Sequence, residues 1–150
     1  MSEELIAQAR EQVDAFSAGD WDRLRAALAP DCVYHELATG RTFHGADEII
    51  AANQGWKDAF PDSHGTVTDS FGVDDRVALQ VTWEGTQSGA LPLPGGAAIE
   101  PTGRQVDIPA IQVVRISDGS IVELTQAFDM LAMLEQLGTV SAEALAGGSR

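Results

Sequence analysis

Three polar side chains interrupt otherwise apolar rows of this sequence, and they are the first candidates for chemistry. His35, Gln112 and Gln126 each have apolar residues two positions away on both sides, in segments that alternate as β-strands do. A buried imidazole or amide without a hydrogen-bond partner costs roughly 1–3 kcal/mol. Three in one interior therefore indicate either mutual hydrogen bonding, directly or through a trapped water, or an apolar pocket with polar groups aimed at a ligand.

The chemistry that these groups support depends on whether they titrate. A primary amide only donates and accepts hydrogen bonds, so Gln112 and Gln126 would orient a carbonyl or stabilise a developing oxyanion. Proton transfer would fall to His35, Asp129 or Tyr34. Asp129 precedes a helical pattern, so its alternative role is to cap that helix. Tyr34 is expected on the face opposite to His35, unless a shift of one residue in the strand exchanges the two.

A further group of residues is predicted to line the pocket without reacting. Trp56 and Trp83 belong either to the core or to a substrate platform, and Asn53 either lines the cavity or faces solvent from its helix. Glu36 and Glu123 are expected to be solvated charges on the outer face of the sheet. The predicted substrate-contacting residues are Tyr34, Asn53, Trp56, Trp83, Leu124 and Phe128.

Helical spacing and strand alternation supply the elements that must position these residues. Apolar residues recur every three to four positions near the N-terminus, from Asp20 to a stop at Pro30, and again over residues 46–60. A last helix is predicted over residues 130–137. The strands are predicted at 32–37, 65–72, 76–86, 105–116 and 119–128.

Helices first, then consecutive strands and a closing helix predict an α+β fold. A strongly curved, mixed or antiparallel sheet would wrap around the third helix, giving a cone-shaped domain that encloses an apolar pocket. One domain is expected to span residues 1–138, with a flexible tail over 139–150. Between the middle strands, the stretch SGALPLPGGAAIEPTG predicts a long loop that is either a functional lid or a tolerated insertion.

The bulk composition argues against several classes of partner. With 23 acidic and 9 basic residues, the formal net charge of -14 would repel nucleic acids and anionic membranes, which leaves uncharged or cationic small molecules. Cys32 is the single cysteine, so no internal disulfide can form. The N-terminus lacks a signal-peptide pattern and no apolar run approaches the roughly 18 residues of a membrane span, so the cytoplasm is the expected compartment. The histidines show no metal-site spacing.

Several short motifs follow one another along the chain: AFSAGDWDRLRAALAPDCVYHE, GADEII…AFPD, WEGTQSG, EPTGRQV, VVRISDGSIVE and DMLAMLEQLG. Together they resemble the SnoaL-like polyketide cyclases of the nuclear transport factor two-like superfamily, over about residues 5–138. The resemblance implies a cone-shaped α+β fold, ring closure by intramolecular aldol chemistry, no cofactor or metal, and a homodimer.

The resemblance also implies where catalytic groups should lie. In that family an aspartate on the last strand acts as acid and base, and a histidine on the preceding strand lies near it. The corresponding places in this sequence hold Gln126 and Gln112. The chain therefore resembles the family in the position of its polar groups and departs from it in their chemistry.

The resulting hypothesis is a cofactor-independent cyclase, of the lyase or isomerase type, that closes a ring in a hydrophobic polyketide-type intermediate of secondary metabolism such as antibiotic biosynthesis. Closure would be pericyclic, without proton transfer, or aldol-type, with His35 or Asp129 titrating. The alternatives are a non-catalytic small-molecule binder and an isomerase or epoxide hydrolase of the same superfamily. The epoxide hydrolase is the least supported, because the predicted inner faces carry no Asp–Arg–Asp-like cluster.

Overall fold

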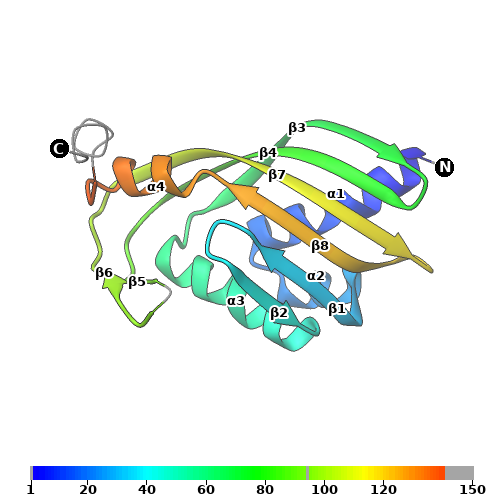
Figure 1. Cartoon of the computed structure of the whole chain (residues 1–150), viewed down its shortest axis with the longest axis horizontal. Coiled ribbons are helices and arrows are strands. Elements are labelled where there is room, and N and C mark those ends of the chain that lie inside the picture. The colour runs from blue at the N-terminus through cyan, green and yellow to red at the C-terminus, as the bar shows by residue number, and fades with distance from the viewer. Residues whose placement is uncertain (1, 94, 141–150) are drawn as a thin grey trace.

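The computed structural model describes residues 2–93 and 95–140, which form a curved sheet with helices packed against it (Figure 1). The flexible tail predicted at 139–150 lies outside the described residues from 141 on. In chain order the elements are α1 (Ser2–Ala18), α2 (Trp21–Ala27), β1 (Leu28–Glu36), β2 (Arg41–His44), α3 (Ala46–Ala59), β3 (His64–Val73), β4 (Arg76–Thr86), β5 (Leu91–Pro92), β6 (Ala98–Ile99), β7 (Gln105–Ser117), β8 (Ser120–Phe128) and α4 (Met130–Gln136).

Two aspartates begin helices by capping them. The side chain of Asp20 accepts a hydrogen bond from the Arg23 amide at 3.2 Å, and that of Asp129 accepts one from the Ala132 amide at 2.9 Å. Each bond satisfies one of the free amides of a first helical turn. After α4, Gly138 adopts a φ of 80°, a conformation that glycine reaches without strain. The alternative role of Asp129 as a helix cap is therefore confirmed.

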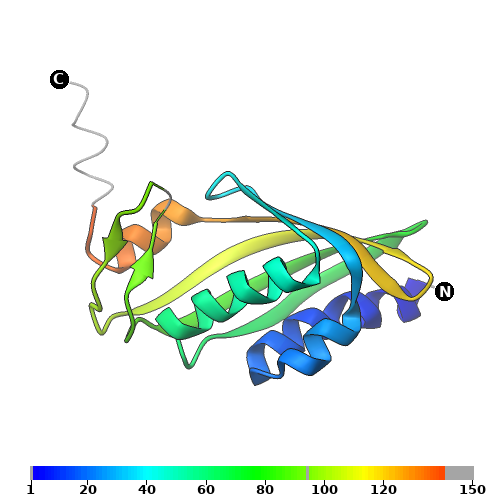
Figure 2. The same cartoon turned by 90° about the horizontal axis from the view of Figure 1, so that it is seen from below.

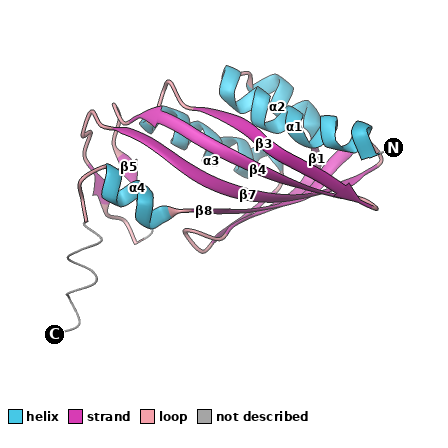
Figure 3. Cartoon of the chain, turned by 90° about the horizontal axis from the view of Figure 1, so that it is seen from above, coloured by secondary structure: helices cyan, strands magenta, loops and turns pink. Residues whose placement is uncertain are grey.

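Six strands form one sheet in the order β2-β1-β8-β7-β4-β3. β1 and β8 run parallel, and the other neighbouring strands are antiparallel. The sheet curves over α3, and α1 and α2 lie against it at one end (Figures 2 and 3). The predicted α+β fold with a mixed, mostly antiparallel sheet is confirmed.

The first strand differs from its prediction. It begins at Leu28 rather than Cys32, and Pro30 lies inside it instead of ending α2, which stops at Ala27. The pairing of β1 with β8 jumps from Leu28 to Val33, and β2 pairs with β1 only from Val33 on. A proline lacks the amide hydrogen that a ladder needs, so it is tolerated where the ladder is interrupted.

Three short strands were not predicted. β2 pairs antiparallel with the end of β1 in a region that was expected to be a turn. β5 and β6 form a small hairpin inside the predicted loop between β4 and β7. Strands of two to four residues carry too little alternation to be recognised in sequence. β2 is defined by its pairing with β1, and β5 and β6 by their pairing with each other.

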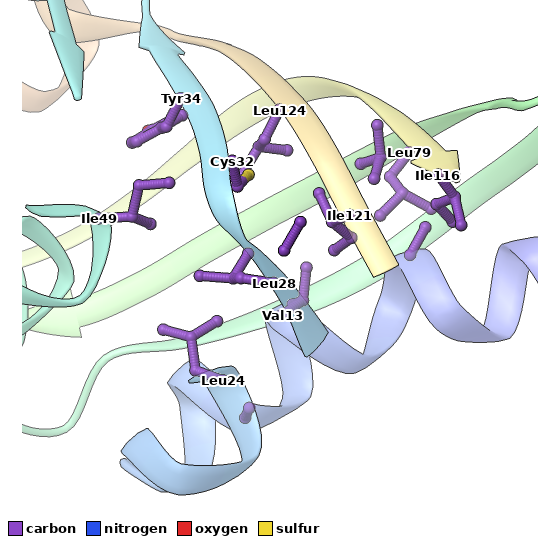
Figure 4. Packing of buried hydrophobic residues seen from close by; sticks show 14 of the residues in the cluster. Val13, Leu24, Leu28, Cys32, Tyr34, Ile49, Leu79, Ile116, Ile121 and Leu124 are labelled. Atoms are coloured by element: carbon purple, nitrogen blue, oxygen red, sulfur yellow. The ribbon is translucent and has the colours of Figure 1, made fainter. Parts of the chain in front are cut away.

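Buried side chains form two clusters on the concave side of the sheet. The larger joins α1–α3 to the strands and includes Val13, Ile49, Leu79 and Ile121, which are among the side chains drawn in Figure 4. The smaller lies at the opposite end; Phe60, Val106, Leu91, Met133 and Leu137 belong to it. The end near α1 is thus solidly packed, and burial of each such side chain contributes about 1.5–3 kcal/mol.

Large apolar side chains are also exposed on the other face of the sheet. Ile111 and Val113 of β7 keep 50% and 42% of their surface exposed. Among the described residues, no helix combines the length and apolar character needed to cross a membrane.

Candidate active site

A cavity of about 90 Å³ lies between the concave face of the sheet and α3. Trp83 and Phe128 form part of its wall and pack against both core clusters, so the cavity occupies the boundary between them. Its remaining apolar lining consists of Phe16, Trp56, Phe60, Gly85, Val106, Ile108 and Met133. Its polar lining consists of Tyr34, Asn53, Ser63, Glu84 and Gln126.

The two glutamines predicted to point inward do so, and they are bonded to each other. Gln112 is 2% exposed, and its Nε2 donates to Gln126 Oε1 at 2.9 Å. Gln112 Oε1 in turn accepts from Nε2 of Gln12 on α1. Gln126 Oε1 also accepts from Trp83 Nε1 at 2.9 Å, which fills both acceptor positions of its carbonyl oxygen. The carboxamide plane of Gln126 is therefore held from two sides.

The amide nitrogen of Gln126 can still donate a hydrogen bond, whereas both acceptor positions of its oxygen are occupied. Nε2 donates one hydrogen to Tyr34 Oη at 2.8 Å, and no other partner among the described residues takes the second. Since Gln126 lines the cavity, this second hydrogen is available to an acceptor inside it. The site therefore offers a fixed donor in an apolar surrounding.

Tyr34 connects this amide to a buried carboxylate. Its hydroxyl donates to Glu36 Oε2 over 3.4 Å, near the upper limit for such a bond. Burial, followed by the negative charge of Glu36, raises the pKa of Tyr34 well above its ordinary value. The phenol therefore stays protonated, and its hydrogen can turn from a distant carboxylate to a nearer acceptor.

Glu36 is the centre of a cluster that the sequence did not reveal. The side chain is 1% exposed, yet Oε1 accepts from Arg41 Nη2 at 2.7 Å and from Thr39 Oγ1 at 2.5 Å. Oε2 accepts from Trp56 Nε1 at 2.9 Å. A buried carboxylate needs such partners, because its desolvation is costly without them. The cluster ties the β1–β2 hairpin to α3 and orients Tyr34 and Trp56 along the cavity wall.

The expectation that His35 faces the interior is wrong, as is the placement of Glu36 on the outer face. On β1, Cys32, Tyr34 and Glu36 point inward, while Leu37 is 59% exposed. The physical reason is β2, which brings Arg41 opposite Glu36 and neutralises a charge that would otherwise be excluded from the core. Alternation of apolar residues alone had favoured the other face.

His35 is consequently placed outside the cavity. Its Nε2 lies 3.0 Å from Glu123 Oε2, and both side chains remain partly exposed. This hydrogen bond is the main cause of the lowered pKa of Glu123, together with the charge of Arg115. The position of Glu123 on the outer face is confirmed, and neither it nor His35 is among the residues lining the cavity.

Most residues predicted to contact a ligand line the cavity, whereas four predicted site residues are not part of its lining: Gln112, His35, Leu124 and Asp129. Leu124 is buried in the larger core cluster (Figure 4), and Asp129 is exposed at the start of α4. Asn53 lines the cavity, and its Nδ2 donates one hydrogen to the Ile49 carbonyl at 2.8 Å. The predicted ligand-contacting residues found in the lining are Tyr34, Asn53, Trp56, Trp83 and Phe128.

Sequence patterns missed several residues of the site. Glu36 shares the strand parity of Tyr34, which is the signal that would have placed it inside. Gln12 recurs at helical spacing beside Ala9 and was hidden by its polarity. Ser63 follows α3 in a turn, where no periodicity operates. Among the described residues, no group of His, Cys, Asp or Glu is arranged to hold a metal ion.

A family model and several solved structures show which known proteins this chain resembles. A family model of the SnoaL-like polyketide cyclases matches residues 7–137. IdmH from Streptomyces antibioticus, described as a candidate polyketide cyclase, is 31% identical over 88% of this chain and 96% of its own, with a TM-score of 0.75.

Two further solved structures share the fold. AclR from Streptomyces galilaeus, described as a candidate hydroxylase, is 27% identical over 92% of this chain and 87% of its own, with a TM-score of 0.77. A SnoaL-like protein from Jannaschia sp. CCS1 is 23% identical, with a TM-score of 0.80 and 94% of both chains covered. The search of curated proteins found no significant match.

Proposed function

This chain belongs to the SnoaL-like polyketide cyclase family, and we propose that it closes a ring in a hydrophobic polyketide-type intermediate of secondary metabolism without a cofactor. The family supports a cyclase-like role in general. The particular reaction is inferred from the cavity and from the hydrogen-bond capacity of its polar groups. The single observation that carries the proposal is the second amide hydrogen of Gln126.

Gln126 acts on a substrate carbonyl by donating this hydrogen. Gln112 and Trp83 fix the amide from behind, so its dipole is oriented before the substrate arrives. A preorganised donor in an apolar cavity stabilises negative charge that develops on the carbonyl oxygen during ring closure. Gln112 is therefore a positioning residue, while Gln126 contacts the reacting group.

Tyr34 provides a second donor to the same oxygen. Its long bond to Glu36 is readily exchanged for a shorter bond to a carbonyl, and its raised pKa keeps the proton in place. Glu36 keeps its ion pair with Arg41 in this exchange. Two neutral donors thus polarise the carbonyl without transferring a proton.

The titratable groups among the described residues of the cavity wall favour pericyclic over aldol-type closure. Tyr34 and Glu84 are the titratable residues among the described lining of the cavity. Glu84 pairs with His64, and both of these side chains are partly exposed. An aldol reaction must remove a proton next to a carbonyl, which a protonated phenol cannot do. Pericyclic closure needs a folded substrate and a polarised carbonyl. The aromatic wall of Trp56, Trp83 and Phe128 supplies the folding, and such orientation lowers barriers by several kcal/mol.

Binding requires the cavity to widen. Its volume of about 90 Å³ is below the roughly 300–1,000 Å³ of ligand pockets for drug-sized molecules. Leu91 of β5 packs with Phe60 and Met133 beside the cavity, so displacement of the β5–β6 hairpin would enlarge it. This supports the lid interpretation of the long loop.

The proposal is tested by replacing Gln126 and following cyclisation of a linear substrate in which a conjugated diene is tethered to an enone. Loss of conjugated absorption and mass spectrometry of the product measure turnover. We expect Gln126→Leu to lower kcat/KM by about 100- to 1,000-fold, since a single preorganised donor is worth that order. Gln126→Glu keeps an acceptor for Trp83 but loses the donor, and should be equally impaired. Exposed Gln80→Leu is the matched control.

A non-catalytic binder is the second candidate, and the amides at the family's acid/base positions favour it. Binding of the linear substrate by the wild-type protein, with cyclisation no faster than in buffer, would select the binder and reject the cyclase. Turnover that is unchanged in Gln126→Leu would remove Gln126 from the mechanism while leaving an enzyme.

We also propose a homodimer, as the family resemblance implies. The exposed Ile111 and Val113 on the uncovered face of the sheet support an interface there. Light scattering should give twice the chain mass, and Ile111→Asp with Val113→Asp should halve it. The cytoplasm remains the compartment predicted from the sequence, and fractionation of the native host tests it.

A further inference from the structure

Ser63 is a buried polar residue whose hydroxyl has no hydrogen-bond partner among the described residues. The residue is 9% exposed and lines the cavity. Buried hydroxyls are almost always bonded, because an unpaired one loses its hydration without compensation. An orphaned hydroxyl on a cavity wall therefore indicates a group that the cavity receives.

The backbone around Ser63 is held firmly although its side chain is not bonded. Its amide donates to the Phe60 carbonyl at 3.0 Å, and its carbonyl accepts from Lys57 Nζ. Gly85 of β4 packs against it so closely that a Cβ at this glycine would lie 3.0 Å from the Ser63 Cβ. The backbone and the Cβ of Ser63 are thus held by three neighbours, as expected of a residue that presents a binding group.

Ser63 and Gln126 belong to different ends of the cavity. Gln126 is paired with Gln112, which is paired with Leu79 of β4. Ser63 instead contacts Gly85, six residues further along the same strand. Apolar and aromatic residues make up most of the remaining lining of the cavity.

The Ser63 end is also the polar end of the cavity. Glu84, Gly85 and Val106 line both the cavity and a neighbouring open groove. That groove is otherwise lined by polar side chains, including Asp62 and Asp107. A ligand atom beside Ser63 therefore lies where the apolar interior meets water.

We propose that Ser63 is a second polar anchor, which bonds an oxygen at the end of the ligand opposite to the carbonyl held by Gln126. This inference rests on the proposed function and narrows its substrate class. The ligand is a slender conjugated molecule with a ketone at its inner end and a hydroxyl or carbonyl oxygen at its outer end. The hydroxyl of Ser63 can donate to that oxygen or accept from it.

Two matched probes test the proposal. 4-Hydroxybenzalacetone carries a ketone and a phenol at opposite ends of a conjugated chain, and benzalacetone lacks the phenol. Calorimetric titration measures the Kd of each with the wild-type chain, Ser63→Ala and Gln126→Leu, with Ser120→Ala on a distant hairpin as control. We expect Ser63→Ala to weaken the hydroxylated probe about five- to tenfold and to leave benzalacetone unchanged. Gln126→Leu should weaken both.

Thermal unfolding of the free variants separates binding from structure. Ser63→Ala removes an unpaired group and should unfold at the wild-type temperature or above it. A lowered unfolding temperature, or equal weakening of both probes, would overturn the anchor while leaving the proposed function intact. Failure of both probes to bind the wild-type chain would reject the cavity as a ketone site, and with it the proposed function and this inference.

Discussion

Two glutamines, the buried Gln87 and the half-buried Gln126, make different use of the same side chain in two regions of the molecule. Gln87 is fully buried after β4, and its Nε2 donates to the carbonyls of Gly89, Ile99 and Glu100. Its Oε1 accepts from the amide and the hydroxyl of Thr102. All its partners belong to the long loop between β4 and β7.

The comparison shows how a structural amide differs from a binding amide. Gln87 has used every donor and acceptor on backbone groups and on Thr102, so nothing remains for a ligand. Gln126 is bonded only by side chains, from β4, β7 and β1, and keeps one hydrogen at an apolar cavity. Because all its hydrogen-bonding groups are occupied by the loop, Gln87 has the structural role of holding that loop in place. Unused capacity indicates that Gln126 meets a partner that is not part of the chain.

The largest expected effect comes from removing the saturated amide. Gln87→Leu leaves several buried groups of the loop unpaired and should lower the free energy of unfolding by about 2–4 kcal/mol. Denaturant unfolding measures the loss, and limited proteolysis should cut between residues 88 and 104. Gln80→Leu, on the exposed face of β4, should stay within about 0.5 kcal/mol of the wild type. An unaffected Gln87→Leu would contradict the structural role.

A smaller loss of stability is expected when Gln112, which bonds Gln126 and Gln12, is replaced. Gln112→Leu leaves Gln12 and the Gln126 oxygen each with one partner fewer, at a cost of about 1–3 kcal/mol. Gln12→Leu added to it removes the stranded partner, so the double variant should cost less than the sum, with a coupling of about 1 kcal/mol. Additive costs in denaturant unfolding would show that the two amides do not support each other.

Alkaline pH sharpens the comparison through Tyr34, the single tyrosine of the chain. Burial raises the pKa of Tyr34, so the folded chain keeps a proton that the unfolded chain loses above about pH 10. The free energy of unfolding should therefore fall above that pH, by up to about 1.4 kcal/mol per unit, and the stabilisation is complete below it.

The ultraviolet band of the phenolate provides the measurement. In the wild-type chain it should appear only together with unfolding, and Tyr34→Phe should flatten the alkaline decline in stability. A phenolate band in the folded protein near pH 10 would show that Tyr34 is not protected as described.

The smallest effect is expected outside the cavity. His35 bonds Glu123 on the partly exposed outer face, where such pairs contribute about 0–1 kcal/mol. His35→Gln should leave both probe affinity and turnover within about twofold of the wild type, since about 0.4 kcal/mol corresponds to that factor. A large loss of turnover with normal stability would return His35 to the mechanism.

Local patterns were sufficient for much of the fold. Helical spacing, the two aspartate caps and the long alternating strands were all predictable, because each depends on residues within a few positions of one another. The inward direction of Gln112 and Gln126 followed from the same alternation. β2 and the β5–β6 hairpin did not, since they are too short to show a period.

The sequence by itself determined the α+β class and the two carboxamides in the sheet interior. Only the tertiary structure decided which face of β1 turns inward. The ion pair with Arg41 offsets the cost of burying Glu36, and Arg41 is placed there by β2, a strand that was not predicted. The tertiary structure also decided how much capacity each amide retains, since the partners of Gln126 lie 14 to 92 residues away. The periodicity of a sequence predicts which way a side chain points, whereas the function of that side chain depends on the groups, distant in sequence, that it contacts in the fold.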